Sequence, residues 1–397
     1  MHKMKKLSDA AHKLEGQRMF QILAVARELE RQGKEILHFE LGDPDFDTPK
    51  NIVQAAIESL SNGETHYAPS SGLLELKKAA SEVTLRSREF KPDLDQLLVC
   101  PGANVQIYYA VACAVNPGEE VIVPDPGFVS YFSILKFLGI KIVRVPLYEK
   151  NEFRLNPDDV KKAITERTRM IIMNSPSNPT GAVMTEGEVR RMYEIAKEYD
   201  VYLLSDEIYA RMLYRDANTS HHSPSKFDHC KERTIVVNGF SKSYAMTGWR
   251  LGVVTGPAEL VNKMGLLLET TTSCVSPFIQ KAGIEALKGS QEPIINMVDK
   301  FRERRDIMVE GLNSIPGITC LKPKGAFYVF PNVAKTGLTS EEFADVMLNQ
   351  AGVALAPGTI FGEYAQGYAR LCYANSVENI KNAIDRMRKA LGTRHSL

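Results

Sequence analysis

Short apolar segments alternate with helical segments through the middle of the chain, and this alternation restricts the fold more than any other feature of the sequence. The strand-like segments lie at 97–100, 120–124, 141–147, 169–174, 201–205, 233–238 and 250–255. Segments with helical periodicity or helix-capping residues separate most of them. Strands and helices that alternate in this way predict an α/β fold with a seven-stranded, mostly parallel sheet and helices on both of its faces.

Two of the separating helices have clear starting signals. Asn156 is expected to cap the helix that begins at Pro157, because proline is tolerated at the first helical position. Thr185 and Glu188 have the spacing of a capping box, and an apolar stripe follows them. Helices are therefore expected to start close to residues 157 and 186.

The pattern changes after about residue 290. A long helical segment at 294–313 precedes shorter elements, which predict a smaller α+β unit. The expected short strands are 318–322, 326–330, 352–355 and 369–373, with helices at 340–350 and 376–391. A chain of 397 residues is long enough for more than one core. We expect an N-terminal segment at 1–47 that packs with the small domain, a large domain at 48–290 and the small C-terminal domain at 291–397.

Composition argues against several classes of protein. The net charge is +1 with both signs mixed along the chain, which does not suit a nucleic-acid or membrane-surface protein. No apolar run approaches the roughly 20 residues of a membrane helix, and the basic start lacks the apolar core of a secretory signal. The six scattered cysteines are typical of reduced thiols. We therefore expect a cytoplasmic protein with small-molecule partners.

Polar residues gather in the loops that follow the predicted strands. Ligands of open α/β sheets bind at the carboxyl ends of the strands. The five loops are "PGAN" at 101–104, "PDPGF" at 124–128, "NSPSNPTG" at 174–181, "SDEIY" at 205–209 and "NGFSK" at 238–242. Their convergence predicts one binding cleft.

The chemistry of these loops indicates one ligand. Lys242 is an amine among small residues, where burial lowers its pKa, and Arg250 is suited to a phosphate. Asp206, Tyr209 and Asn178 add a carboxylate, a phenol and an amide, and the helix after "PGAN" offers its N-terminus to an anion. Pyridoxal phosphate uses all of these groups, because its aldehyde forms a Schiff base with a lysine and its ring nitrogen needs a carboxylate.

The motifs "NPTG", "SDEIY" and "SK-x4-TGWR-x-G", in this order and spacing, resemble those of class I/II aminotransferases, the fold type I enzymes of the aspartate aminotransferase superfamily. The resemblance extends from "LGDPDFDTP" to "ARLCYANS" and is strongest to the prokaryotic aspartate and aromatic subgroup. It implies a homodimer whose large domain binds pyridoxal phosphate. It also implies a ping-pong transfer of the amino group of an L-amino acid to a 2-oxo acid, expected to be 2-oxoglutarate.

The resemblance further implies roles for the matching residues. Lys242 would hold the cofactor and shuttle the proton, Asp206 would pair with the pyridine nitrogen, and Tyr209 and Asn178 would bond to the ring oxygen. Phe128 would stack on the ring. The phosphate would contact Ala103, Asn104, Ser241, Arg250 and, from the neighbouring subunit, Tyr67.

For the substrate, the resemblance implies that Arg370 grips the α-carboxylate, helped by Asn178 and the backbone of Gly42. Gln17 and Met19 stand near positions where dicarboxylate-specific relatives have small hydroxyl residues, and Asn104 stands where they have a cation. These departures argue against aspartate as the specific substrate.

Two other functions stay open at this point. A β-eliminating lyase or an aminocyclopropane-type synthase would use the same cofactor residues. A transcription regulator would use the same domain as an effector sensor. The segment "SHHSPSKFDHC" at 220–230 fits no standard zinc spacing, so we expect a polar surface loop there and no metal.

Overall fold

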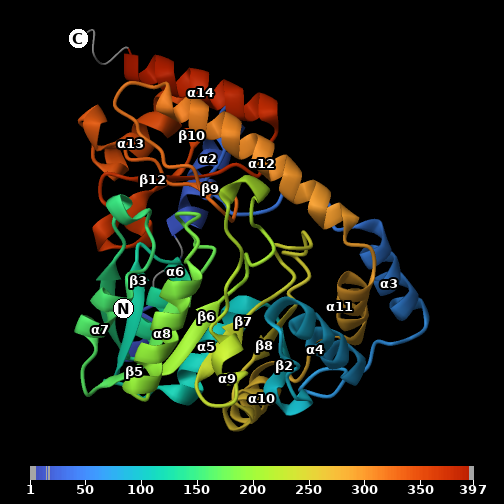
Figure 1. Cartoon of the computed structure of the whole chain (residues 1–397). Coiled ribbons are helices and arrows are strands. Elements are labelled where there is room, and N and C mark those ends of the chain that lie inside the picture. Colours follow the sequence, from blue (N-terminus) through green and yellow to red (C-terminus); the bar gives the residue numbers. More distant parts are fainter. Residues whose placement is uncertain (1–5, 15, 17, 393–397) are drawn as a thin grey trace.

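A seven-stranded sheet forms the centre of the computed structural model, which describes residues 6–14, 16 and 18–392 (Figure 1). The strand order is β2-β8-β7-β6-β5-β3-β4. The strands are β2 (Leu97–Cys100), β3 (Glu120–Asp125), β4 (Lys141–Pro146), β5 (Thr168–Asn174), β6 (Tyr202–Asp206), β7 (Thr234–Val237) and β8 (Gly252–Thr255). All neighbouring pairs from β7 to β4 are parallel, which confirms the predicted mostly parallel α/β sheet.

Helices cover both faces of this sheet, and the strands are therefore apolar along nearly their whole length. The helices packed on the large sheet are α3 (Lys50–Ser61), α4 (Leu74–Arg88), α5 (Ala103–Ala114), α6 (Val129–Phe137), α7 (Pro157–Ala163), α8 (Glu186–Glu198), α10 (Ala258–Thr272) and α11 (Pro277–Lys288). The two predicted starting signals are confirmed. Asn156 caps α7, and Thr185 forms a capping box with Glu188 at the start of α8.

Strand β8 determines where the chain between it and β7 lies. It runs antiparallel to both of its neighbours, β2 and β7. The chain therefore leaves the carboxyl end of β7 and re-enters the sheet at the same edge. The connecting segment, residues 238–251, stays at the edge where ligands of such sheets bind.

Smaller sheets and long helices lie above the large sheet in Figure 1, coloured orange and red. One pairs β1 (Leu37–His38) with β10 (Val353–Ala354), and the other has the order β11-β12-β9. The remaining elements are α1 (Asp9–His12), α2 (Arg18–Arg31), α9 (Ser225–Asp228), α12 (Glu292–Asn313), β9 (Tyr328–Val329), α13 (Ser340–Val346), β11 (Ala356–Pro357), β12 (Ala369–Cys372) and α14 (Val377–Gly392). The division of the chain at residues 47 and 290 stays a prediction.

The predicted strand at 318–322 is wrong. Only Thr319 makes an isolated bridge, to Asn332. The side chain of Asn313 accepts a hydrogen bond from the backbone N–H of Cys320 and donates one to its carbonyl. A side chain thus satisfies the groups that a neighbouring strand would otherwise pair, and the segment runs on as a loop.

Within the part of the chain that the structure describes, no helix is both long enough and apolar enough to cross a bilayer.

A partly buried ionic cluster ties helix α2 to strand β1. His38 contacts Glu40 through Nδ1 at 2.8 Å and Glu30, on α2, through Nε2 at 3.1 Å. Glu40 is fully buried, so its charge needs a partner. The hydrogen bond to Glu40 raises the pKa of His38 to about 9 against the opposing effect of burial. His38 therefore carries a charge at neutral pH and holds two acidic side chains together.

This cluster predicts a pH dependence of stability. Because the folded pKa of His38 lies above its unfolded value, the contribution is complete below pH 6.5 and is lost as the pH rises through about 9. We expect a loss of about 1–2 kcal/mol over this range, less than the full linkage value, because a third of the side chain is exposed. Urea unfolding at several pH values measures it.

His38→Gln should remove this pH dependence, whereas His12→Gln, at an exposed histidine of α1, should retain it. Equal loss of stability in the wild type and in His38→Gln between pH 6.5 and 9 would contradict the assignment.

Candidate active site

A cleft of about 360 Å³ opens at the carboxyl edge of the large sheet. Its volume lies in the range of small-molecule sites. It gathers all of the predicted site residues except one: Gly42, Ala103, Asn104, Phe128, Asn178, Asp206, Tyr209, Ser241, Lys242, Arg250 and Arg370. The exception is Tyr67, whose side chain is 89% exposed and does not line the cleft. The predicted convergence of the strand-end loops is therefore confirmed.

Lys242 lies on the segment between β7 and β8, and its amine is almost removed from water. The Nζ atom donates a hydrogen bond of 2.5 Å to the carbonyl oxygen of Gly42. Burial lowers the pKa of Lys242 to about 8, and the nearby Arg370 and Arg250 act in the same direction. A neutral, nucleophilic amine is thus accessible far below the usual pKa of lysine.

A glutamine on α5 fixes the start of this segment. Gln106 is fully buried, donates a hydrogen bond of 2.8 Å to the carbonyl of Asn238 and accepts one from its N–H at 3.1 Å. The side chain of Asn238 in turn accepts a hydrogen bond from the N–H of Gly239. A Cβ atom at Gly252 would come within 2.2 Å of the Gln106 amide, so glycine is required there for the close approach.

Asp206 ends strand β6 and is buried at the bottom of the cleft. Its Oδ2 atom accepts a hydrogen bond of 2.5 Å from the hydroxyl of Tyr131, and its Oδ1 atom accepts one from the N–H of Ile208. Burial raises the pKa of Asp206 to about 6, and the bond from Tyr131 limits this rise. The carboxylate is mostly ionised at neutral pH and can pair with a cationic ring nitrogen.

Tyr209 follows Asp206 closely and is also buried. Its hydroxyl lies 2.7 Å from the hydroxyl of Tyr328, which belongs to β9. Burial holds the pKa of Tyr209 well above 10. Tyr209 is therefore a neutral phenol that can donate one hydrogen bond.

The N-terminus of α5 and a guanidinium form an anion seat. Helix α5 begins at Ala103, after Gly102 with φ of +89°. A Cβ atom at Gly102 would lie 2.4 Å from Nη2 of Arg250, so the missing side chain lets this cation stand against the helix start. Free helix N–H groups beside a cation suit a phosphate.

Arg370 is held on β12 with its guanidinium between two aromatic rings. The ring centres of Tyr328 and Phe361 lie 4.6 Å and 4.7 Å from its Cζ atom. Its Nη1 atom donates to Oδ1 of Asn178 at 3.2 Å, while its Nε atom is buried without a partner among the described residues. A buried donor that lacks an acceptor fits a substrate carboxylate.

A second carboxylate, Glu207, points away from the cleft because successive side chains of a strand alternate between its faces. It accepts hydrogen bonds from Arg88, His221 and Ser223. Although burial alone would raise the pKa of Glu207, the charges of Arg88 and His221 hold it well below its usual range. The prediction of a surface loop at 220–230 is wrong here, because this loop turns His221 and Ser223 inward to satisfy Glu207.

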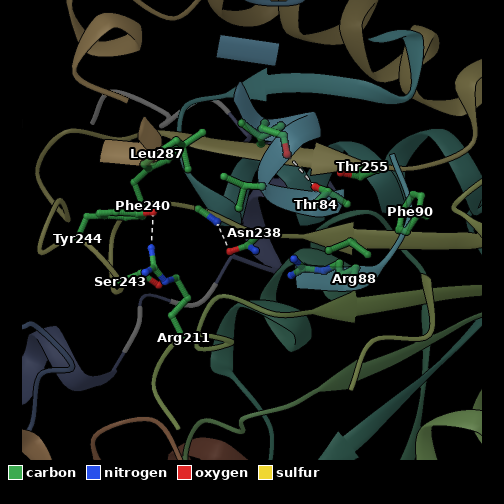
Figure 2. Close-up of a pocket in the computed structure, with 15 residues that line it drawn as sticks. Thr84, Arg88, Phe90, Arg211, Asn238, Phe240, Ser243, Tyr244, Thr255 and Leu287 are labelled. Carbon is green, nitrogen blue, oxygen red and sulfur yellow. Dashed lines mark hydrogen bonds between the residues drawn. The ribbon is translucent and has the colours of Figure 1, made fainter. Parts of the chain in front are cut away.

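A smaller cavity of about 80 Å³ lies on the Glu207 side of the sheet, between α4, β7 and β8 (Figure 2). Figure 2 shows Arg211 bonding to the hydroxyl of Tyr244, and Arg88 and Asn238 in the wall. Much of the wall is apolar, and its most buried cation, Arg88, is already paired with Glu207. None of the predicted site residues lines this cavity, so the reactive groups belong to the cleft.

Sequence reasoning missed two residues of the site, Tyr131 and Tyr328. Tyr131 lies three residues after Phe128, on the same side of the start of α6, so helical spacing could have indicated it. Tyr328 gave no such signal. Gln17, whose position entered the specificity argument, lies outside the described residues.

The donor set fits pyridoxal phosphate. The cleft offers a poorly solvated amine for the aldehyde and a buried carboxylate for the ring nitrogen. It also offers a neutral phenol for the ring oxygen and an anion seat for the phosphate. A separate guanidinium, on Arg370, remains for the substrate.

Comparison with known proteins agrees with this geometry. The model of the family "Aminotransferase class I and II" matches residues 34–387. An aspartate aminotransferase of Pyrococcus abyssi is 42% identical over 90% of this chain and 92% of its own length. Aromatic-amino-acid aminotransferase 2 of Thermococcus litoralis is 41% identical over 90% and 92%. The solved aspartate aminotransferase of Thermus thermophilus with maleate superposes with a TM-score of 0.93 at 35% identity, covering 98% of this chain and all of the other.

The family match spans most of the chain, and these relatives share its fold and well over a third of its residues. The chain therefore belongs to the class I and II aminotransferases, and it is a pyridoxal-phosphate-dependent enzyme that transfers an amino group from an amino acid to a 2-oxo acid.

Proposed function

We propose that the cleft at residue 242 carries out this transfer, with Lys242 as the group that both holds the cofactor and moves the proton. The observation that carries the proposal is the poorly solvated amine of Lys242 in one cleft with Asp206 and Arg370. When bound, pyridoxal phosphate supplies an electron-withdrawing ring that makes the α-hydrogen of the amino acid acidic. The amine of Lys242, once free, would take that proton from the α-carbon and deliver it to the carbon on the other side of the amino nitrogen.

Other residues of the cleft would hold the reactants in place. Asp206 stays ionised opposite the ring nitrogen, and Tyr209 donates to the ring oxygen beside the amide of Asn178. Phe128 covers one face of the ring. The phosphate is bound by the N-terminus of α5, where Ala103 and Asn104 offer their N–H groups, and by Ser241 and Arg250.

Arg370 orients the substrate by its α-carboxylate. Two aromatic ring centres lie within 4.7 Å of its Cζ atom and support the planar guanidinium, so a carboxylate bound there is held in the same cleft as Lys242. The side chain of Asn178, already bonded to Arg370, supports the same position. The elimination and ring-forming alternatives have no support from the relatives, whose names are all those of aminotransferases.

The lining of the cleft favours an aromatic or large apolar donor. Its apolar side chains include Met19, Phe20, Leu41 and Ile107. The cations in its described lining are Lys242, Arg250 and Arg370, each with a task of its own. No cation of the described lining is left for a second carboxylate, which disfavours aspartate.

We further propose 2-oxoglutarate as the acceptor, a homodimer and a cytoplasmic location. The exposed Tyr67 supports the dimer, because an 89% exposed tyrosine is suited to a contact with a second copy of the chain. Sedimentation of the purified enzyme tests the dimer. A half-reaction screen, each amino acid in turn with the cofactor absorbance recorded, tests the donor.

Lys242→Ala should lower turnover by at least about 10³-fold, because both the cofactor link and the proton carrier are lost. Borohydride treatment of the wild type should leave a cofactor adduct on the peptide that contains residue 242. Lys263→Ala, at an exposed lysine of α10, is the matched control and should retain full activity. Near-normal turnover of Lys242→Ala would reject the assignment.

Cofactor affinity should depend on pH through Asp206. The dissociation constant of pyridoxal phosphate should rise as the pH falls through about 6, because a protonated carboxyl no longer pairs with the ring nitrogen. In Tyr131→Phe this rise should begin at a higher pH, because the lost hydrogen bond stabilised the ionised form. Fluorescence titration of the two apoenzymes with pyridoxal phosphate measures the dissociation constant of each at several pH values. Identical pH profiles in the wild type and in Tyr131→Phe would contradict the role of Tyr131.

Asn104→Lys should improve the use of aspartate. Residue 104 lines the cleft, and a cation on its side chain would bond to the second carboxylate of aspartate, which should raise the kcat/KM ratio of aspartate to tyrosine by at least about tenfold. Asn104→Gln is the neutral control. If wild-type enzyme already prefers aspartate to aromatic donors in the screen, the proposed donor class is wrong.

A further inference from the structure

Tyr328 contacts two residues with different tasks in the proposed reaction. Its hydroxyl lies 2.7 Å from that of Tyr209, and its ring lies under the guanidinium of Arg370, 4.6 Å from ring centre to Cζ. Tyr328 is 1% exposed, lines the cleft and belongs to β9, whereas Tyr209 follows β6 of the large sheet. One side chain thus joins the ring-oxygen donor to the carboxylate-binding cation.

The proposed role of Tyr209 as donor to the cofactor requires one direction of the bond between the two phenols, because the geometry alone allows either hydroxyl to be the donor. Burial raises the pKa of both, so each keeps its single proton. If Tyr209 donated to Tyr328, it would have no proton left for the cofactor. If Tyr328 donates instead, Tyr209 accepts that bond and its own proton is free to point into the cleft. Among the described residues, Tyr209 is the hydrogen-bond partner of the Tyr328 hydroxyl.

A third segment of the chain, at Gly42, restricts the position of the Tyr328 hydroxyl. A Cβ atom at residue 42 would lie 1.9 Å from the hydroxyl oxygen of Tyr328, so only glycine leaves room for it. The carbonyl of the same Gly42 accepts the hydrogen bond of Lys242. The position of the hydroxyl is therefore set by packing against the segment that also holds the lysine.

We propose that Tyr328 is a positioning residue with two roles. Its hydroxyl donates to Tyr209 and so directs the hydroxyl proton of Tyr209 into the cleft. Its ring supports the guanidinium of Arg370 and keeps that guanidinium in its orientation. The proposal rests on the proposed role of Tyr209 as donor to the ring oxygen of the cofactor. A phenol that accepts one hydrogen bond becomes a stronger donor of another. The hydroxyl and the ring of Tyr328 can be removed separately, and each loss has its own signature.

Tyr328→Phe removes the hydroxyl and leaves the ring. A hydrogen bond to the ring oxygen makes the protonated form of the bound cofactor more acidic, so a weaker bond should raise the midpoint of its visible absorbance titration, by about half a pH unit. The KM of the amino donor should change less than about twofold, because the ring still supports Arg370. Tyr328→Leu should give the same spectral shift and also raise KM by about fivefold.

Tyr209→Phe separates failure of this inference from failure of the proposed function. If Tyr209→Phe leaves the midpoint unchanged, Tyr209 is not the ring-oxygen donor and the proposed function of that residue fails. If Tyr209→Phe raises the midpoint and Tyr328→Phe does not, only the role of Tyr328 is overturned. If Tyr328 acts through Tyr209, the double variant should match Tyr209→Phe alone, and a further shift in the double variant would overturn the proposal.

Tyr373→Phe is the matched control. Tyr373 and Tyr214 form another buried pair of phenols, with hydroxyls 2.8 Å apart, and neither lines the cleft. The control should lose a similar amount of stability and keep the wild-type midpoint. Should Tyr328→Phe fail to fold, Gly42→Ala provides a second test, because it displaces the hydroxyl of Tyr328. Gly42→Ala in the Tyr209→Phe background controls for its effect on Lys242, whose amine bonds to the Gly42 carbonyl. An unchanged midpoint in Gly42→Ala would then overturn the proposal.

Discussion

The removal of one lysine amine from water is the constraint on which the rest of this site depends. A buried ammonium is unfavourable, and the two guanidiniums that share the cleft with Lys242 add to the repulsion. The carbonyl of Gly42 and the charge of Asp43 offset this in part, and the amine is left close to losing its proton. A solvated lysine would be too basic to act as a nucleophile near neutral pH, so burial itself provides the reactivity.

The rigid surroundings of the lysine follow from strand direction. Because β8 is antiparallel to β7, the chain between them stays at one edge of the sheet, where the side chain of Gln106, on α5, bonds to both the N–H and the carbonyl of its first residue, Asn238. The N-terminus of the same helix lies against Arg250 and forms the anion seat of the cleft. One helix therefore contributes both to the anion seat and to the position of the segment that carries Lys242.

The sequence allowed prediction of those parts of the site that lie at strand ends in short motifs. Lys242, Asp206 and Arg250 could be assigned because each follows or precedes a legible strand. Tyr328 could not, because its contact with Tyr209 joins residues 119 positions apart through packing. The sequence of the loop at 220–230 predicts a polar, exposed segment, but His221 and Ser223 point inward because they bond to the buried Glu207. The segment 318–322 alternates like a strand, but the Asn313 side chain takes its backbone bonds. In both errors a distant side chain overrides a local pattern.

The pair Asp206 and Glu207 has a consequence for how variants of this enzyme are interpreted. Adjacent acids occupy opposite sides of one strand, the first facing the cleft and the second neutralised by Arg88 and His221. Loss of Arg88, at the end of α4, would leave the charge of Glu207 less well compensated, next to Asp206 in the chain, and would make Asp206 harder to ionise. A substitution of Arg88 would then impair the cleft in the same way as a substitution within it, although Arg88 does not line the cleft.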